Sequence, residues 1–165
     1  MATPLLGDPN FRRTVVLVLQ HDGDASIGVV LNRPTEELVE SHIPTWGPVV
    51  AEPGLVHFGG PVEPQVAIGL ATGHAGEPTG VAGLSIVDLE TSPSSGSRSV
   101  RIYSGYAGWG SGQLEAEIAE GSWYVVPASP DDPFDRPEGL WGRILRRQQG
   151  YLSLVSTFPD DVAFN

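Results

Sequence analysis

The sequence contains no cysteine and no lysine. The absence of cysteine excludes disulfides, thiolate catalysis and cysteine-ligated zinc. The absence of lysine excludes a P-loop lysine, a Schiff-base lysine and the attachment of pyridoxal phosphate. All nine cationic residues are arginine, against 20 acidic residues, and the formal net charge is −11. This acidity repels the phosphates of DNA and RNA and argues against direct nucleic-acid binding.

Long apolar runs are also missing. The longest, Val15–Leu19, is far shorter than the roughly 20 residues of a membrane-spanning helix. No basic segment followed by an apolar run opens the chain, so we expect a cytoplasmic protein without a membrane partner. The 165 residues suffice for one core, and we expect a single domain over residues 1–165, with 151–165 as a C-terminal tail.

Apolar patterning predicts several strands. Phe11–Gln20 is rich in β-branched residues and continuous enough for a central strand. Asp22-Gly23 suits a type I′ turn, which would connect it to a return strand at Ser26–Leu31. Further strands are predicted at Leu55–Phe58, Val66–Ala71, Leu84–Leu89 and Trp123–Val126, with loops at 73–83 and 91–99.

Two helices outside the centre of the chain are predicted from their N-terminal signals. Thr35 can cap a short helix at Glu36–Ser41. Asp135 and Glu138 have the spacing of a capping box for the longest helix, within 136–149. The arginines of that helix are interpreted as a solvated face, with an anion or partner surface as the alternative. They are Arg143, Arg146 and Arg147.

Four glycines in eight residues lie at the centre of the chain, between a strand ending near Ser104 and a helix at Gln113–Glu120. They are Gly105, Gly108, Gly110 and Gly112. Their spacing is neither the dinucleotide fingerprint nor a Walker A loop, and Ser111 does not lie in a nucleophile elbow. Free amides at the helix start favour a carboxylate or phosphate, although Glu115 in the first turn competes for them.

The side chains around these glycines also allow two interpretations each. Ser111 is interpreted as the helix N-cap in preference to a nucleophile. The neighbouring aromatic residues are interpreted as core in preference to a platform that stacks on a ligand. They are Tyr103, Tyr106, Trp109, Trp123 and Tyr124.

No cofactor is predicted, and the spacing of the acidic and histidine residues predicts no metal site. Asp22, Asp24 and Ser26 occupy the first three ligand positions of an EF-hand loop. Ile27 then replaces the turn glycine and Arg33 replaces the bidentate glutamate, so a turn is preferred. No two of the four histidines have the i, i+4 spacing of a metal pair.

The chain resembles the YqgE/AlgH family of small bacterial proteins over about residues 2–150. The resemblance is carried by Pro9, Phe11-Arg12-Arg13-Thr14-Val15, His21, Gly28-Val29-Val30-Leu31-Asn32-Arg33-Pro34, Gly59-Gly60-Pro61-Val62 and the segment from Gly105 to Glu115. It implies a single α+β domain whose mixed, mostly antiparallel sheet curls into a pseudo-barrel with flanking helices. It implies no catalytic residues, and one branch is linked by name to transcriptional control. Family members usually have a strand ahead of Ala2-Thr3-Pro4, so we expect this chain either to lack part of an edge strand or to begin at a shorter start.

These observations favour a non-catalytic binding or regulatory domain that recognises a small anionic ligand or a protein partner. The candidate ligand-binding residues are Asn32, Arg33, Gly59, Gly60, Tyr106, Gly110, Ser111, Gly112 and Gln113. Arg33 would supply the charge and the loop amides directional donors, which requires Arg33 to reach Gly110. The alternative is a hydrolase that uses Ser111 or a histidine-activated water, and it requires a histidine within hydrogen-bond reach of Ser111 or of a carboxylate that faces the pocket.

Overall fold

Eight strands form one sheet in the computed structural model, which describes residues 1–73, 76–93 and 99–159. The strands are β1 (Val16–His21), β2 (Ala25–Val30), β3 (Pro34–Leu38), β4 (Leu55–Phe58), β5 (Val62–Thr72), β6 (Glu77–Pro78), β7 (Leu84–Val87) and β8 (Val100–Gly110). Their order is β1-β2-β8-β5-β7-β6, with β4 also paired to β8 and β3 paired to β4. Only β4 and β8 run parallel among these pairs of the described chain.

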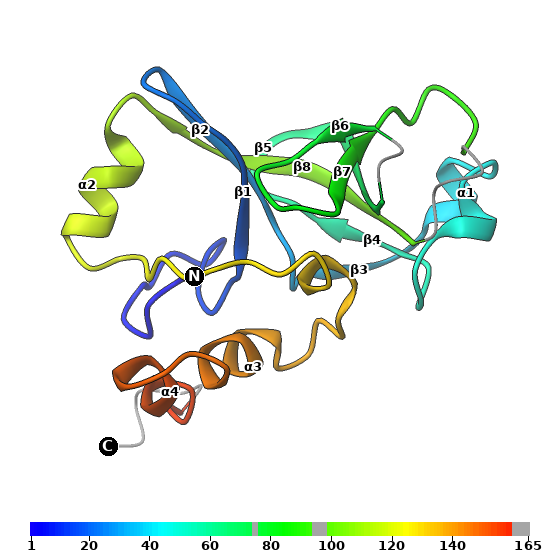
Figure 1. Ribbon diagram of the computed structural model, residues 1–165. Coiled ribbons are helices and arrows are strands. Elements are labelled where there is room, and N and C mark those ends of the chain that lie inside the picture. The colour runs from blue at the N-terminus through cyan, green and yellow to red at the C-terminus, as the bar shows by residue number, and fades with distance from the viewer. Residues whose placement is uncertain (74–75, 94–98, 160–165) are drawn as a thin grey trace.

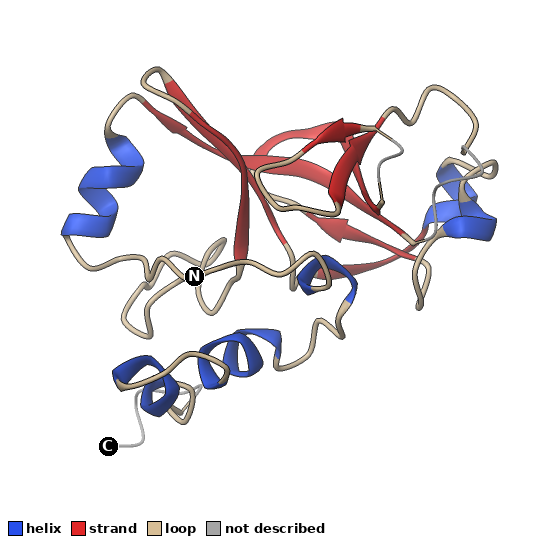
Figure 2. Cartoon of the chain, in the orientation of Figure 1, coloured by secondary structure: helices blue, strands red, loops and turns tan. Residues whose placement is uncertain are grey.

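Short helices flank the sheet. They are α1 (Val39–His42), α2 (Gln113–Ala119), α3 (Leu140–Arg146) and α4 (Tyr151–Val155), with single 3₁₀ turns η1 (Gly47–Val49) and η2 (Asp132–Phe134). The sheet curls into a half-barrel, with α2 and α1 beyond opposite ends and α3 and α4 together on one side (Figures 1 and 2). This is the predicted single α+β domain. No helix in the described part of the chain is long and apolar enough to cross a bilayer.

Strand β8 is the centre of the sheet, because β2, β4 and β5 all pair with it. The predicted glycine loop is therefore wrong, since Gly105, Gly108 and Gly110 lie inside β8. Close packing between main chains accounts for Gly105, where a Cβ would lie 2.5 Å from the carbonyl oxygen of Gly60, but not for Gly108 or Gly110, where the nearest atoms lie 3.5 and 4.0 Å away. A Cβ on Gly59 would lie 2.2 Å from the carbonyl oxygen of Gly105, and one on Gly60 would lie 2.2 Å from that of Tyr106.

The first hairpin is confirmed, but its turn and its place in the sheet differ from the prediction. Strand β1 lies at one end of the strand order, not at the centre. Its apolar run is continuous because both faces of β1 pack against apolar side chains. Leu17 belongs to the main core, and Val16 packs against a second hydrophobic cluster. The turn is not type I′, since Gly23 does not have a positive φ. Instead Asp22 Oδ1 accepts the N–H groups of residues 24 and 25 at 2.9 and 3.0 Å.

Two predicted segments have a different secondary structure. Residues 34–38 form β3, and only Val39–His42 is helical. The hydroxyl of Thr35 caps no helix because it donates to the carbonyl of Val56 in β4 at 2.8 Å. The predicted strand at 123–126 is a single bridge between Trp123 and Ala2.

Helix α3 begins later than predicted. Gly139, with φ of 71°, precedes it, and no side chain caps it. The expected capping residue Asp135 accepts a hydrogen bond from Arg143 instead. The predicted tail contains α4, whose Val155 is buried, and residues 160–165 lie outside the described chain.

The main core fills the space between the sheet and α3. Leu70 and Tyr103 come from the sheet, while Trp141, Ile144 and Leu145 come from α3. The two predicted loops extend partly beyond the described residues, at 74–75 and 94–98, and the first contains the short strand β6.

Candidate functional site

A cavity of about 730 Å³ opens where the chain enters β1, leaves β2 and begins α3. Four arginines line this arginine pocket, which is four of the nine in the chain. They are Arg12, Arg13, Arg33 and Arg146. The remaining lining residues are Asn32, Pro34, Pro137, Glu138, Gly139, Trp141, Gly142, Ser156, Phe158 and Pro159.

Arg33 is partly buried in this pocket, and its Nη2 donates to the carbonyl of Arg12. Burial lowers the pKa of Arg33 below its ordinary value. Arg147 shows the opposite case, because hydrogen bonds to Asp132 raise its pKa. Desolvation thus disfavours the charged form of Arg33, and an anion in the pocket would offset this effect.

Asn32 positions the main chain at the pocket edge. Its Nδ2 donates to the carbonyl of Arg13, and its Oδ1 accepts the N–H of Val15, both at 2.9 Å. These bonds hold Arg13 at φ of 57°, a left-handed conformation that costs a non-glycine residue energy. The guanidinium of Arg13 then lies 4.1 Å from the ring centroid of Trp141. Asn32 therefore contributes to the pocket by positioning the side chain of Arg13.

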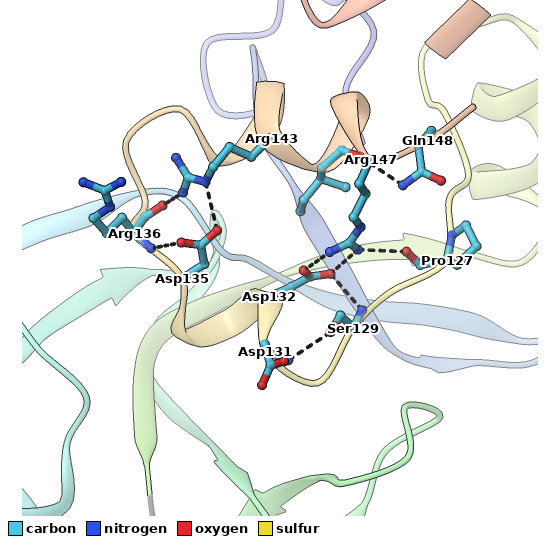
Figure 3. A network of polar contacts seen from close by, with 10 residues as sticks. Pro127, Ser129, Asp131, Asp132, Asp135, Arg136, Arg143, Arg147 and Gln148 are labelled. Carbon is cyan, nitrogen blue, oxygen red and sulfur yellow. Dashed lines mark hydrogen bonds and ion pairs between the residues drawn. The ribbon is translucent and has the colours of Figure 1, made fainter. Parts of the chain in front are cut away.

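The arginines of α3 do not form one solvated face. Arg143 donates to Asp135 at 2.9 Å, and Arg147 donates to both carboxylate oxygens of Asp132 (Figure 3). These two side chains tie α3 to the preceding turn. Arg146 differs, because it lines the arginine pocket and its guanidinium makes no hydrogen bond or ion pair with the described residues.

The predicted joint site is not assembled. Gly110 pairs with Ala25, at the far end of β2 from Arg33. The five steps from Ala25 to Val30 alone span about 17 Å at roughly 3.3 Å per residue, and Arg33 lies beyond Val30. This is farther than an arginine side chain reaches. Arg33 and Asn32 line the arginine pocket, whereas the segment from Gly110 to Gln113 does not.

The other candidate residues make local contacts. Ser111 donates to the carbonyl of Gly23 at 2.7 Å, so it is not the N-cap, a position taken by Gly112. Gln113 Oε1 accepts the N–H of Gly110 at 3.1 Å. Tyr106 donates through its hydroxyl to a carboxylate oxygen of Glu63 at 3.3 Å.

Comparison with known proteins identifies the family. The sequence model of the AlgH-like family DUF179 matches residues 1–153. The chain belongs to the AlgH-like family. UPF0301 protein SCO2948 of Streptomyces coelicolor is 49% identical over all of this chain and 92% of its own length. A UPF0301 protein of Thermobifida fusca is 44% identical with the same coverage.

Two solved structures resemble this AlgH-like fold. The crystal structure of DIP2367 from Corynebacterium diphtheriae has a TM-score of 0.86 and 32% identity, covering 96% of this chain and 89% of that one. The solution structure of AlgH from Pseudomonas aeruginosa has a TM-score of 0.70 and 27% identity, covering 96% and 91%.

The aromatic residues near β8 are core in this AlgH-like protein, as predicted. Trp109 and Trp123 are buried and pack against Phe11, with ring centroids 6.2 and 5.5 Å away. Both indole N–H groups donate to Oε2 of Glu117, at 2.9 and 2.7 Å. Burial opposes the charge of Glu117, but these bonds and one from Gln113 lower its pKa overall.

The described residues supply no catalytic histidine to Ser111, whose hydroxyl meets only the Gly23 carbonyl. A serine–histidine–glutamate chain occurs elsewhere in this AlgH-like structure. His21 Nδ1 lies 2.7 Å from the hydroxyl of Ser26, and its Nε2 lies 3.4 Å from Glu115. Ser26 is only 3% exposed and lines neither the arginine pocket nor the two smaller cavities. These contacts between Ser26, His21 and Glu115 therefore stabilise the β1–β2 hairpin.

A buried polar cluster lies inside the half-barrel. Arg101 is fully buried, and its guanidinium donates to three main-chain carbonyls, those of residues 51, 52 and 133. Burial and the charge of Arg101 lower the pKa of His57 to about 4. The hydroxyl of Tyr103 has no hydrogen-bond partner among the described residues, and burial raises its pKa.

Sequence reasoning found Asn32 and Arg33 but missed three arginines of the pocket, Arg12, Arg13 and Arg146. The first two lie in a segment that carries the family resemblance, and Arg146 was assigned to solvent. No local pattern in the sequence brings Arg146 to the other three arginines, because they come together from distant segments of the chain. Among the described residues, no group of three or more histidine or acidic side chains is arranged to hold a metal ion.

Proposed function

We propose that the protein binds a small anionic molecule in the arginine pocket. The observation that carries this proposal is the gathering of four of nine arginines around one cavity in a chain of net charge −11. Glu138 is the only acidic residue in the described lining. A general need for solubility does not produce such a local reversal of charge.

Arg33 and Arg146 are the residues best placed to contact the ligand. Arg33 carries a partly desolvated charge, and only its Nη2 is used, by a main-chain carbonyl. Arg146 is exposed, and its guanidinium makes no hydrogen bond or ion pair with the described residues. Guanidinium groups with unused N–H donors form bidentate pairs with carboxylates and phosphates.

The size of the pocket and the charge of the protein restrict the ligand. The volume of about 730 Å³ lies within the range of pockets for small molecules. The negative charge of the whole chain repels long polyanions, whereas a compact anion can enter a local positive region. We therefore favour a phosphorylated or polycarboxylate metabolite over a nucleic acid.

Binding without chemistry suits a sensor or regulatory domain of the cytoplasm, where such metabolites are concentrated. A hydrolase that uses Ser111 has less support, because Ser111 lacks the activating histidine that this reaction class needs. The form that uses a histidine-activated water has one matching pair, His42 and Glu37, which is exposed at a smaller cavity. Arg33 and Ser111 also lie toward opposite ends of β2, so a bound anion would not meet that hydroxyl.

The proposal is tested by calorimetric titration of the full chain at low ionic strength with phosphate, pyrophosphate and citrate. Pyrophosphate is expected to bind, and Arg33→Gln is expected to weaken its affinity about tenfold or more, because a charge-assisted hydrogen bond contributes about 1.5–3 kcal/mol. Arg146→Gln should weaken it by a similar factor.

Arg136→Gln is the matched control, because this arginine precedes the same helix without lining the pocket. It should bind pyrophosphate as the unaltered protein does. The proposal fails if none of the three anions binds, or if the control loses as much affinity as Arg33→Gln, since the effect would then come from general charge.

A further inference from the structure

Glu138 is the one acidic residue among the described residues that line the arginine pocket. It is exposed, and its carboxylate makes no hydrogen bond or ion pair with the described residues. Burial lowers the pKa of His57 to about 4, so that imidazole is neutral at pH 7 and is no counter-ion, although the charge of Glu138 acts on it weakly. The carboxylate of Glu138 is therefore available to a ligand.

Two neighbouring carboxylates behave differently. Asp135 accepts a hydrogen bond from Arg143 at 2.9 Å, and Asp132 accepts hydrogen bonds from Arg147 (Figure 3). Such charge-assisted pairs form readily where a carboxylate lies within reach of a guanidinium. Glu138 lines a cavity together with four arginines and pairs with none of them. The open space of the cavity therefore lies between its carboxylate and the guanidinium groups.

The fold keeps these opposite charges apart. Glu138 precedes α3 and Arg146 is the last residue of α3, so the seven residues of the helix separate them by about 10 Å at a rise of roughly 1.5 Å per residue. Arg33 lies on another element, just after β2, and its Nη2 donates to the carbonyl of Arg12. The pocket thus presents positive and negative charge from different sides.

We propose that the arginine pocket is specific for a small zwitterion, a phosphorylated amine whose phosphate contacts Arg33 and Arg146 and whose ammonium group contacts Glu138. This inference rests on the proposed function of the pocket and names the class of ligand. Glu138 attracts a ligand that carries an ammonium group, but it repels an anion that lacks one. It is therefore the residue that determines specificity, because it favours one ligand class and disfavours its competitor.

The test compares phosphoethanolamine with hydroxyethyl phosphate by calorimetric titration of the full chain at pH 7 and low ionic strength. The two compounds differ only in that a hydroxyl replaces the ammonium group, which makes hydroxyethyl phosphate the more negative. Attraction to the arginines alone would favour hydroxyethyl phosphate. We expect the opposite order, with phosphoethanolamine bound about threefold to tenfold more tightly, as an ion pair with a partly solvated carboxylate allows.

Glu138→Gln should abolish this preference. Its binding of pyrophosphate should be unchanged or tighter, because a repulsive charge is removed, and this measurement also shows that the pocket is intact. Glu120→Gln is the matched control, since Glu120 is exposed at the end of α2 and does not line the pocket. The control should keep the preference for phosphoethanolamine.

The possible failures can be told apart. Equal binding of the two esters by the unaltered protein, or tighter binding of hydroxyethyl phosphate, would overturn the zwitterion proposal and leave the proposed function intact. A preference that persists in Glu138→Gln, or that is also lost in Glu120→Gln, would overturn the role of Glu138. If pyrophosphate and both esters fail to bind the unaltered protein, this inference and the proposed function are refuted together.

Discussion

Both terminal guanidinium nitrogens of Arg147 donate to the carboxylate of Asp132, Nη1 to Oδ1 and Nη2 to Oδ2, and the distance from Nη2 to Oδ2 is 2.7 Å (Figure 3). Asp132 is only 6% exposed, and its Oδ2 also accepts the N–H of Ser129 at 2.9 Å. The pair joins the last turn of α3 to the 3₁₀ turn η2, which in turn contacts β8. It therefore couples the C-terminal helices to the central strand.

Asp132→Ala should destabilise the fold by about 1–3 kcal/mol, because the Ser129 amide and part of the Arg147 guanidinium lose their acceptor. The lower end of this range allows for the partial exposure of Arg147, because solvent weakens its interaction with Asp132. Urea unfolding measures the loss. Asp131→Ala, at an exposed neighbouring carboxylate, should change the free energy of unfolding by less than about 0.5 kcal/mol. Equal effects of the two substitutions would show that the ion pair contributes nothing.

Burial of His57 makes stability depend on pH. Its pKa is lowered to about 4 in the folded state, against 6.5 ordinarily. The unfolded chain therefore takes up this proton first as the pH falls, and folding stability decreases between about pH 6.5 and 4. From pH 7 to pH 5 the loss from this residue should be about 2 kcal/mol.

His57→Gln should remove most of that loss, whatever its effect on stability at pH 7. The measurement is the difference in free energy of unfolding between pH 7 and pH 5. His42→Gln is the control, since this imidazole is exposed, and it should keep the full decrease. An unaltered pH dependence in His57→Gln would mean that another group carries the effect.

Removal of the Tyr103 hydroxyl should be harmless. The residue is fully buried, and the hydroxyl has no partner among the described residues. Tyr103→Phe should therefore leave the free energy of unfolding unchanged or raise it by up to about 1 kcal/mol, because no hydrogen bond is lost and desolvation is relieved. Denaturant titration checks this. A loss above about 1 kcal/mol would reveal an acceptor for the hydroxyl.

Gly59→Ala should be among the most damaging single substitutions, at about 3 kcal/mol or more. The added Cβ would lie 2.2 Å from the Gly105 carbonyl oxygen, so β4 and β8 would have to separate. Gly23→Ala is the control because a Cβ there has open space and the backbone has no positive φ. Thermal unfolding of both variants gives the comparison, and similar midpoints would contradict the close packing.

The strands with strong local patterns were predictable. The β1–β2 hairpin, β4 and much of β5 and β7 follow from alternation and turn residues. The glycine-rich stretch was wrongly predicted to be a loop, because the sequence does not show whether the missing side chains make room for a ligand or for another main chain. The approach of Gly59 to Gly105 is a contact between distant segments, which no local pattern records.

The arginine pocket was only half predictable for a related reason. Asn32 and Arg33 follow the end of a strand, where functional residues are common, so their position predicts a binding role. Arg146 meets them across more than a hundred residues of chain, and its helical position resembles that of any solvated arginine. The partners of Arg143 and Arg147 come from the irregular segment before α3, whose path had no local signal.

Strand β8 emerges from the ribosome after all three strands that it joins. Until then the nascent chain can form the hairpins β1–β2 and β3–β4 and the pair β5–β7, but no shared neighbour connects them. Arrival of β8 would bring these pieces together in one late step. The main-chain edges of β2, β4 and β5 stay unpaired during synthesis, and such edges are the kind of surface through which unfinished chains associate.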